Sequence, residues 1–198
     1  MRTILFSLAL ASIPAAFAQS GTPRPVDPAA SKVLWTATKV TGEHTGGVPV
    51  KEGSISEMDG VLTGAEVTMD MKGITCIDID NEATNAKLVG HLKSEDFFDV
   101  EKFGTATFKS TKVEKLADVA PGKPNYRVTG ELTIKGETKP NTFDCLFWMD
   151  GSVARAAATF TFDRAQYDIK YRSGTFFPDL GDKVISDTVS LTFDMSAK

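Results

Sequence analysis

The chain is poor in the side chains that most often carry catalysis or bind metals. Its 198 residues include two histidines and two cysteines. Cys76 and Cys145 form no C-x-x-C pair, and His44 and His91 belong to no H-E-x-x-H motif or Cys/His cluster. The sequence also contains no G-x-S-x-G motif and no glycine-rich phosphate loop. We therefore predict no catalytic residues, no metal site and no cofactor, and hence a protein that is not an enzyme.

Three neighbouring acidic residues, Asp78, Asp80 and Glu82, resemble the start of a calcium-binding loop. The glycine and the terminal glutamate of an EF-hand are missing from this stretch. We interpret the three side chains as part of a solvated turn.

Positive charge is also scarce, and it is not concentrated anywhere. Lysine and arginine total 22 against 26 acidic residues, which gives a formal net charge of −4. A protein that holds nucleic acid electrostatically needs a basic patch, so we predict no nucleic-acid partner. Beyond the N-terminus no apolar run reaches the ~18 residues of a membrane helix, and we predict no transmembrane segment. A homodimer is compatible with this sequence.

The N-terminal residues have the pattern of an export signal. Arg2 supplies a positive start, residues 4–11 form a short apolar stretch, and Ala16-Phe17-Ala18 has the small-x-small pattern of a cleavage site. We predict a signal peptide over residues 1–18, cleavage after Ala18 and a periplasmic location. Residues 19–30 are rich in proline and small polar residues and are expected to form a flexible leader. The domain is expected to span residues 31–198.

Export to an oxidising compartment makes a disulfide chemically allowed. Cys76 and Cys145 both lie in apolar, strand-like surroundings, where an unpaired cysteine acts as a small hydrophobe. The sequence is therefore compatible with a disulfide and with two free thiols.

Apolar and polar residues alternate with a period of two along most of the remaining chain, which is typical of strands with one dry face and one wet face. Asp59-Gly60 and Asp150-Gly151 lie between such runs and suit tight hairpin turns. About eight strands are expected, which is enough for a closed antiparallel barrel that encloses one small ligand. A two-sheet sandwich fits the same alternation. The runs are residues 33–40, 48–71 as a hairpin, 105–109, 126–135, 143–147, 158–163 and 189–195.

One region departs from this pattern. Between Glu82 and Val100, Leu88 and Leu92 recur at helical spacing. Ser94, followed by two acidic residues, is expected to cap a second short helix. The region is predicted to be a helical insertion in an otherwise β domain.

Four ordered blocks of this sequence resemble the YceI-like family. Together they cover roughly residues 31–195. They are Trp35 with Lys39-Val40-Thr41-Gly42-Glu43-His44-Thr45-Gly46, residues 87–100 ahead of Ala106-Thr107-Phe108, residues 128–136, and Asp163-Arg164-x-x-Tyr167-x-Ile169-x-Tyr171. The resemblance implies a mainly β, lipocalin-like extended barrel, exported to the periplasm, whose tunnel takes a polyisoprenoid, a fatty-acyl lipid or a comparable amphiphile. It implies no cofactor and no established reaction.

We therefore expect storage, shielding or transport of such a lipid. The alternatives are an enzyme that modifies an isoprenoid lipid and a stress-related structural module with a solid core. Small residues on the dry faces favour a hollow interior; they are Ala37, Ala65, Ala106, Ala156 and Ala158. The residues predicted to line the tunnel are Trp35, Ala37, Val67, Met69, Phe108, Leu132, Phe160, Phe162, Leu191 and Phe193.

Three polar side chains near the end of an apolar strand are candidates for contact with a lipid head group. Arg164 suits either a head group or a structural ion pair with a nearby acid. Tyr167 and Tyr171 suit either a head group or packing with the hydroxyl in water.

Overall fold

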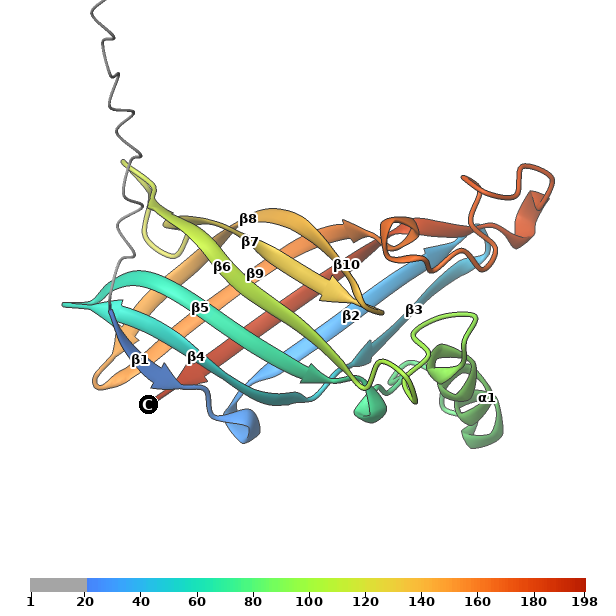
Figure 1. The fold of residues 1–198 in the computed structure, drawn as a ribbon, viewed down its shortest axis with the longest axis horizontal. Coiled ribbons are helices and arrows are strands. Elements are labelled where there is room, and N and C mark those ends of the chain that lie inside the picture. Colours follow the sequence, from blue (N-terminus) through green and yellow to red (C-terminus); the bar gives the residue numbers. More distant parts are fainter. Residues whose placement is uncertain (1–20) are drawn as a thin grey trace, which may run out of the picture.

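The computed structural model describes residues 21–198. The predicted signal peptide, residues 1–18, and the first two leader residues lie outside the described part. Within the described part, ten strands form one antiparallel sheet that curls around a single core, with one α-helix beside one end of it (Figure 1). The elements are β1 (Thr22–Pro25), β2 (Lys32–Lys39), β3 (Gly42–Gly47), β4 (Val50–Met58), β5 (Val61–Asp70), α1 (Glu82–Lys93), β6 (Thr105–Lys115), β7 (Tyr126–Ile134), β8 (Glu137–Asp150), β9 (Val153–Asp163) and β10 (Ile185–Ala197).

The residues that follow β1 contact the end of β10, although the two strands are not neighbours in the strand order. The order is β1-β4-β5-β6-β7-β8-β9-β10-β2-β3. Val26, just after β1, forms a bridge with Ala197 at the end of β10, and the Asp27 N–H donates to the Ser196 carbonyl at 2.8 Å. Figure 1 shows β1 beside the C-terminus at the end of the molecule opposite α1. The predicted fold class is thus confirmed, and the sandwich alternative is not what the structure adopts.

The sheet has ten strands, and eight were predicted. The two extra strands are β1, with the sequence TPRP, and β3, with the sequence GEHTGG. Neither has an alternating apolar pattern, and prolines are tolerated where a strand lies at a sheet edge, as β1 does. Residues 22–30, which belong to the predicted leader, contain β1, which pairs with β4, and a 3₁₀ turn, Pro28–Ala30.

The alternation found in the sequence matches the two faces of the curled sheet. In β7, Val128 and Leu132 are buried while Arg127 and Glu131 are exposed. Gly130, where a bend was predicted, faces a bulge in the partner strand β6 between Ser110 and Lys112. A side chain at position 130 would collide with the ring of Phe108 and the Lys109 carbonyl, so glycine allows this close approach.

Tight turns join neighbouring strands where the sequence predicted them. Asp59 and Gly60 both have positive φ, 52° and 75°, between β4 and β5. Gly151, at φ 60°, lies between β8 and β9. A third turn, Lys135-Gly136, was not predicted; it ends β7 one residue earlier than expected.

The helical insertion contains one helix, and the predicted second helix is absent from it. Asn81 caps the start of α1 by accepting a hydrogen bond from the Thr84 N–H at 2.9 Å. Ser94 ends α1 and starts no new helix: the Phe98 and Val100 N–H groups donate back to carbonyls in the last turn of α1. The N–H groups that a second helix would need for its own hydrogen bonds therefore bond to the free carbonyls at the end of α1. No helix in residues 21–198 has the length and apolarity needed to cross a bilayer.

Candidate functional site

The core inside the curled sheet contains two cavities with apolar walls, each of about 80 Å³. Four side chains, one each from β2, β5, β7 and β10, border both cavities. They are Val33, Met69, Leu132 and Leu191. The two cavities therefore follow one another inside the sheet, and together they are called the lumen below.

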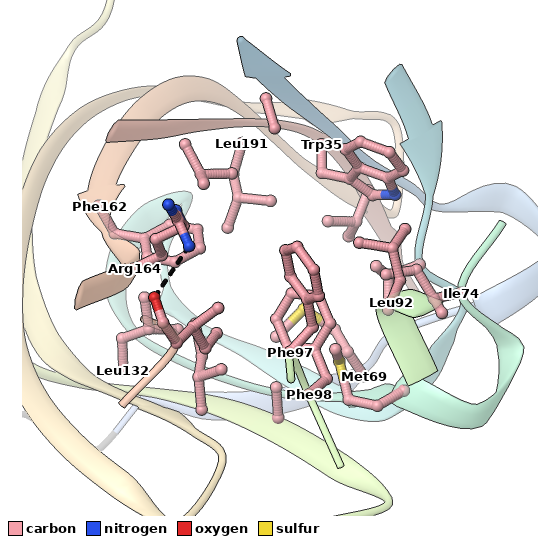
Figure 2. Close-up of a pocket in the computed structure, with 18 of the residues that line it drawn as sticks. Trp35, Met69, Ile74, Leu92, Phe97, Phe98, Leu132, Phe162, Arg164 and Leu191 are labelled. Atoms are coloured by element: carbon pink, nitrogen blue, oxygen red, sulfur yellow. Dashed lines mark hydrogen bonds between the residues drawn. The ribbon is translucent and has the colours of Figure 1, made fainter. Parts of the chain in front are cut away.

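The first cavity lies at the end of the sheet beside α1, because residues from α1 and from the turns after it form part of its wall (Figure 2). Leu92, in the last turn of α1, and Phe97 and Phe98, in the turns after it, contribute to its wall. Ile74, ahead of α1, and Trp35, from β2, contribute as well, and Figure 2 shows these side chains around the space with Leu191 and Phe162. The insertion thus covers this end of the lumen.

The second cavity lies deeper and is rich in aromatic side chains. The rings of Phe143 and Phe160 stack with centroids 4.5 Å apart, and Phe108 and Phe193 each pack against Phe143. Cys145 also faces this space. Its wall offers many apolar contacts and little opportunity for specific hydrogen bonds.

The ten residues predicted to line the tunnel all border the lumen. Trp35, Ala37 and Phe162 border the first cavity. The second is bordered by Val67, Phe108, Phe160 and Phe193, and Met69, Leu132 and Leu191 border both. Contact with a ligand stays a prediction for all ten.

Some residues of the lumen wall were not predicted from the sequence. Val33, Val48, Ile74, Leu92, Phe97, Phe98, Ile169 and Ile185 border the first cavity and were not predicted. The sequence signal that could have found three of them is the Leu92 to Phe98 block, since large apolar residues in a polar insertion must pack against something. Val33 lies in the same alternating run as Trp35, so that pattern could have found it, whereas the remaining four lie outside clean strand alternation.

The lumen is narrow without a ligand. Each cavity exceeds the space that one water requires, but both are smaller than the roughly 300–1,000 Å³ of a typical small-molecule pocket. A long chain would therefore have to displace side chains. Met69 borders both cavities and is well suited to this, because methionine is unbranched and adapts its shape easily.

Arg164 borders the first cavity, but its guanidinium is fully engaged within the protein. It is 3 % exposed, and an ion pair of 3.1 Å joins it to Asp187. Its remaining N–H groups donate at 2.9 to 3.0 Å to the backbone carbonyls of Ile169, Tyr171, Ile185 and Ser186. Four of the five guanidinium N–H groups are therefore hydrogen-bonded to backbone carbonyls, and the ion pair with Asp187 adds a charge contact in which Asp187 Oδ1 accepts no hydrogen bond. This geometry supports the structural ion pair over the head-group contact.

The two tyrosines differ in position. Tyr167 is 2 % exposed and packs edge-on against Phe162, and burial raises the pKa of its hydroxyl to about 12. Tyr171 is half-buried and packs edge-on against His91, with ring centroids 4.5 Å apart, and against Phe97. Because Phe97 also borders the first cavity, Tyr171 stands between the lumen and the surface.

A surface hollow of about 490 Å³ lies on the outer side of Tyr171. Both signs of charge line it, with Lys135, Lys170 and Arg172 opposite Asp96 and Asp168. Lys135 is held in place by donating to the carbonyls of residues 95 and 168, at 3.0 and 3.1 Å. The hollow is thus a polar region beside the apolar lumen.

Both cysteines carry free thiols and are buried. Burial raises the pKa of Cys145 from 9.0 to about 12, which lowers the thiolate population about a thousandfold.

We therefore expect Cys145 to resist alkylation at pH 8 in the folded protein and to react as soon as denaturant unfolds it. Mass spectrometry of tryptic peptides after timed alkylation measures this. Modification of Cys145 at the rate of an unfolded peptide would contradict the prediction.

Comparison with known proteins gives a family match over most of the chain. The model of the YceI-like domain matches residues 25–197. Among curated relatives, UPF0312 proteins of Photorhabdus laumondii and Yersinia enterocolitica are 33% and 31% identical over 133 and 131 residues. These alignments cover 66% and 65% of this chain and the same shares of the relatives. A UPF0312 protein of Vibrio parahaemolyticus is 34% identical over 106 residues, which is 50% of this chain and 53% of the relative. The chain thus matches between about half and two thirds of the length of these relatives.

Solved structures share the fold at lower sequence identity. BcnA of Burkholderia cenocepacia is 22% identical with a TM-score of 0.62, over 87% of this chain and 99% of that chain. A polyisoprenoid binding domain from Saccharophagus degradans, implicated in plant cell wall breakdown, is 19% identical with a TM-score of 0.62, over 88% and 97% of the two chains. The likeness establishes a common architecture.

Proposed function

Since this chain belongs to the YceI-like family, we propose that its lumen binds the tail of a long-chain isoprenoid, such as a quinone or polyprenyl lipid, or of a similar amphiphile. The role is storage, shielding or transport in the periplasm, without catalysis. The predicted export signal supports the location. The polyisoprenoid-binding domain with the same architecture supports the class of ligand.

The observation that carries the proposal is a pair of neighbouring cavities with apolar walls, which share four lining residues inside a single curled sheet. A hydrocarbon tail forms no hydrogen bonds, so it suits walls that offer none. The one charged residue at the wall, Arg164, donates four hydrogen bonds to backbone carbonyls and forms an ion pair with Asp187, so its charge is compensated within the protein. Burial of a tail there costs no polar desolvation on the protein side.

The energetics favour affinity over selectivity. Each buried methylene contributes about 0.8 kcal/mol, so even a short tail contributes several kcal/mol. Ordering the tail and displacing side chains such as Met69 offset part of this gain. Because apolar contact is non-directional, selection between lipids rests on tail length and on the head group.

The hollow beside Tyr171 is the proposed site of the head group. The Tyr171 hydroxyl is a hydrogen-bond donor suited to a quinone oxygen or a phosphate, and Arg172 supplies positive charge, whereas Lys170 is ion-paired with Asp168. Tyr171 packs on Phe97, which borders the lumen. A lipid whose head group lies in the hollow would therefore insert its tail past Phe97 into the first cavity.

Identification of a bound lipid tests the proposal directly. The protein isolated from the periplasmic fraction of a producing bacterium is expected to release an isoprenoid or acyl lipid into organic solvent, close to one per chain. Mass spectrometry of the extract names it. Protein that carries no lipid and takes none up after incubation with quinones, polyprenols and fatty acids would support the solid-core alternative, which the small volume of the two cavities favours.

The position of the tail can be measured with the two tryptophans. Trp35 borders the first cavity, whereas Trp148 lies on the outer face of β8, next to Arg155. In the Trp148→Phe variant, a fatty acid brominated along its tail is expected to quench most of the Trp35 emission, because bromine quenches on contact. In the matched Trp35→Phe variant, Trp148 emission should stay within about a tenth of its starting value. Equal quenching of both variants would place the tail on the outer surface and contradict the proposal.

A further inference from the structure

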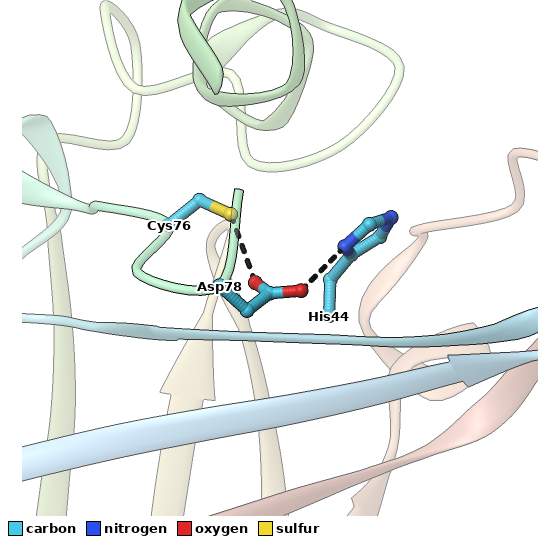
Figure 3. Close-up of side chains that lie close together, drawn as sticks. All are labelled: His44, Cys76 and Asp78. Carbon is cyan, nitrogen blue, oxygen red and sulfur yellow. Dashed lines mark hydrogen bonds and ion pairs between the residues drawn. The ribbon is translucent and has the colours of Figure 1, made fainter. Parts of the chain in front are cut away.

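A second cluster of reactive side chains lies outside the lumen, at the edge of the sheet formed by β3. His44 projects from β3, and Cys76 and Asp78 come from the segment that connects β5 to α1 (Figure 3). One ring nitrogen of His44, Sγ of Cys76 and a carboxylate oxygen of Asp78 all lie within 4.8 Å of one another. Neither the lumen nor the surface hollow beside Tyr171 uses these residues.

The connecting segment runs along β3 as an additional strand would. The Thr75 N–H donates to the Gly47 carbonyl and the Ile77 N–H donates to the Thr45 carbonyl, both at 2.9 Å. Gly46 permits this approach, because a Cβ at that position would meet the Thr75 carbonyl oxygen and the Trp35 ring. Side chains on β3 and on the segment are therefore fixed opposite one another by backbone hydrogen bonds.

The carboxylate of Asp78 lies between the other two side chains. Nδ1 of His44 is 2.9 Å from Oδ2, and the Cys76 thiol donates to Oδ1 at 3.1 Å. The Thr45 N–H also donates to Oδ1, at 3.0 Å.

We propose that His44, Cys76 and Asp78 bind a divalent transition-metal ion of the zinc type. Zinc binds thiolate at about 2.3 Å and imidazole or carboxylate at about 2.0 to 2.2 Å, so donor atoms around one ion lie roughly 3 to 4 Å apart. His44 Nδ1 lies 2.9 Å from Oδ2 of Asp78, Cys76 Sγ lies 3.1 Å from Oδ1, and the three donor atoms lie within 4.8 Å of one another, so small side-chain shifts would bring them to that spacing. A set of sulfur, nitrogen and oxygen donors favours zinc over calcium or magnesium, which prefer oxygen alone.

The site has room for a fourth ligand from solution. The His44 and Asp78 side chains are about 30 % exposed, so water reaches the cluster, whereas the thiol is buried behind them. Three protein ligands with an accessible fourth position are the arrangement in which zinc exchanges water or binds a small ligand.

An ion at this position would also hold one wall of the lumen. It would join the connecting segment to β3 through side chains, in addition to the backbone hydrogen bonds. The same segment carries Ile74, which borders the first cavity, and its Thr75 carbonyl accepts a hydrogen bond from Nε1 of Trp35 at 3.1 Å. Metal binding should therefore raise the thermal stability of the folded chain.

Cobalt titration of the metal-stripped protein under reducing conditions tests the proposal, because Co²⁺ reports its ligands by absorption. We expect one equivalent of Co²⁺ to give a sulfur-to-cobalt charge-transfer band in the near ultraviolet, and Zn²⁺ to abolish the band by displacing cobalt. The Cys76→Ser variant should lose the band. The Cys145→Ala variant is the matched control, because it removes the other thiol and should retain it.

The His44→Ala variant covers the case in which Cys76→Ser does not fold, since His44 is partly exposed and its removal leaves the core intact. It should bind Co²⁺ at least ~10-fold more weakly, given that losing even an indirect partner of a metal ligand costs that much. Zn²⁺ should raise the melting temperature of the unaltered protein and leave that of His44→Ala unchanged. Absence of the charge-transfer band from the unaltered protein, or its persistence in Cys76→Ser, would overturn the proposal.

Discussion

Replacing Ala156 with phenylalanine is expected to weaken the binding of a long-chain lipid at least ~10-fold, a loss of about 1.4 kcal/mol or more. Ala156 lies on the inner face of β9 and borders the second cavity. A phenyl ring there fills the deep half of the lumen, and overpacking costs the fold about 1 to 3 kcal/mol, which a domain of this size tolerates. Quenching of Trp35 by brominated lipids of increasing length measures the affinity.

The dependence on tail length distinguishes a blocked lumen from general damage. A short tail that occupies the first cavity should bind the Ala156→Phe variant almost as well as the unaltered protein, whereas a tail that needs both cavities should not. The neighbouring Ala157→Phe variant is the matched control, because Ala157 points to the outer face of the same strand. Equal affinity of both variants for long tails would show that the second cavity holds no ligand.

The inner faces of the long strands could be predicted from the sequence because each strand has one dry and one wet side. The pattern in β7, where buried Val128 and Leu132 alternate with exposed Arg127 and Glu131, is a direct consequence of that difference. The edge elements could not be predicted, since β1 pairs through backbone groups in a proline-rich stretch and β3 has little apolar surface to bury. Backbone hydrogen bonds leave no periodic signal in side-chain chemistry.

The polar sites were harder to predict because they depend on distant segments meeting. Sequence reasoning assigned Asp78 to a solvated turn and found no partner for His44, since 34 positions separate them. Their contact arises because residues 75 and 77 pair with β3. Cys76 lies in strand-like surroundings in the sequence, but side-chain chemistry does not indicate which strand such a segment pairs with. The prediction of no metal site thus rested on sequence motifs alone, whereas the proposed site is formed by this pairing.

The sequence left two interpretations of Arg164 open, a head-group contact and a structural ion pair, for a similar reason. The acid next to it in sequence, Asp163, caps the 3₁₀ turn Arg164–Tyr167 by accepting from the Ala165 N–H. The ion-pair partner is Asp187, at the start of β10, beyond a long loop. The sequence did not indicate which acid would pair with Arg164, although the interpretation as a structural ion pair agrees with the geometry.

Substitution of Arg164 by methionine is accordingly expected to destabilise the fold by about 3 to 5 kcal/mol, the usual cost of breaking a buried ion pair. Asp187 would lose its positive partner while still accepting hydrogen bonds from the hydroxyls of Ser173 and Thr175, and four carbonyls would lose their donor. At about 2 to 4 °C per kcal/mol for a domain of this length, the melting temperature should fall by roughly 10 °C. Thermal unfolding followed by circular dichroism measures the change.

Arg127→Met is the matched control for this prediction, because Arg127 also pairs with an aspartate through two short contacts, 2.7 and 3.0 Å from the Asp144 carboxylate. That pair is about half exposed, and exposed ion pairs contribute about 0 to 1 kcal/mol. Its loss should lower the melting temperature by no more than a few degrees. Arg164→Lys keeps the charge but supplies three donors where the site has five acceptors, so it should recover only part of the stability. If Arg164→Met melted within a few degrees of Arg127→Met, the guanidinium would not be what holds the loop between β9 and β10 against the lumen, and its availability to a lipid head group would have to be reconsidered.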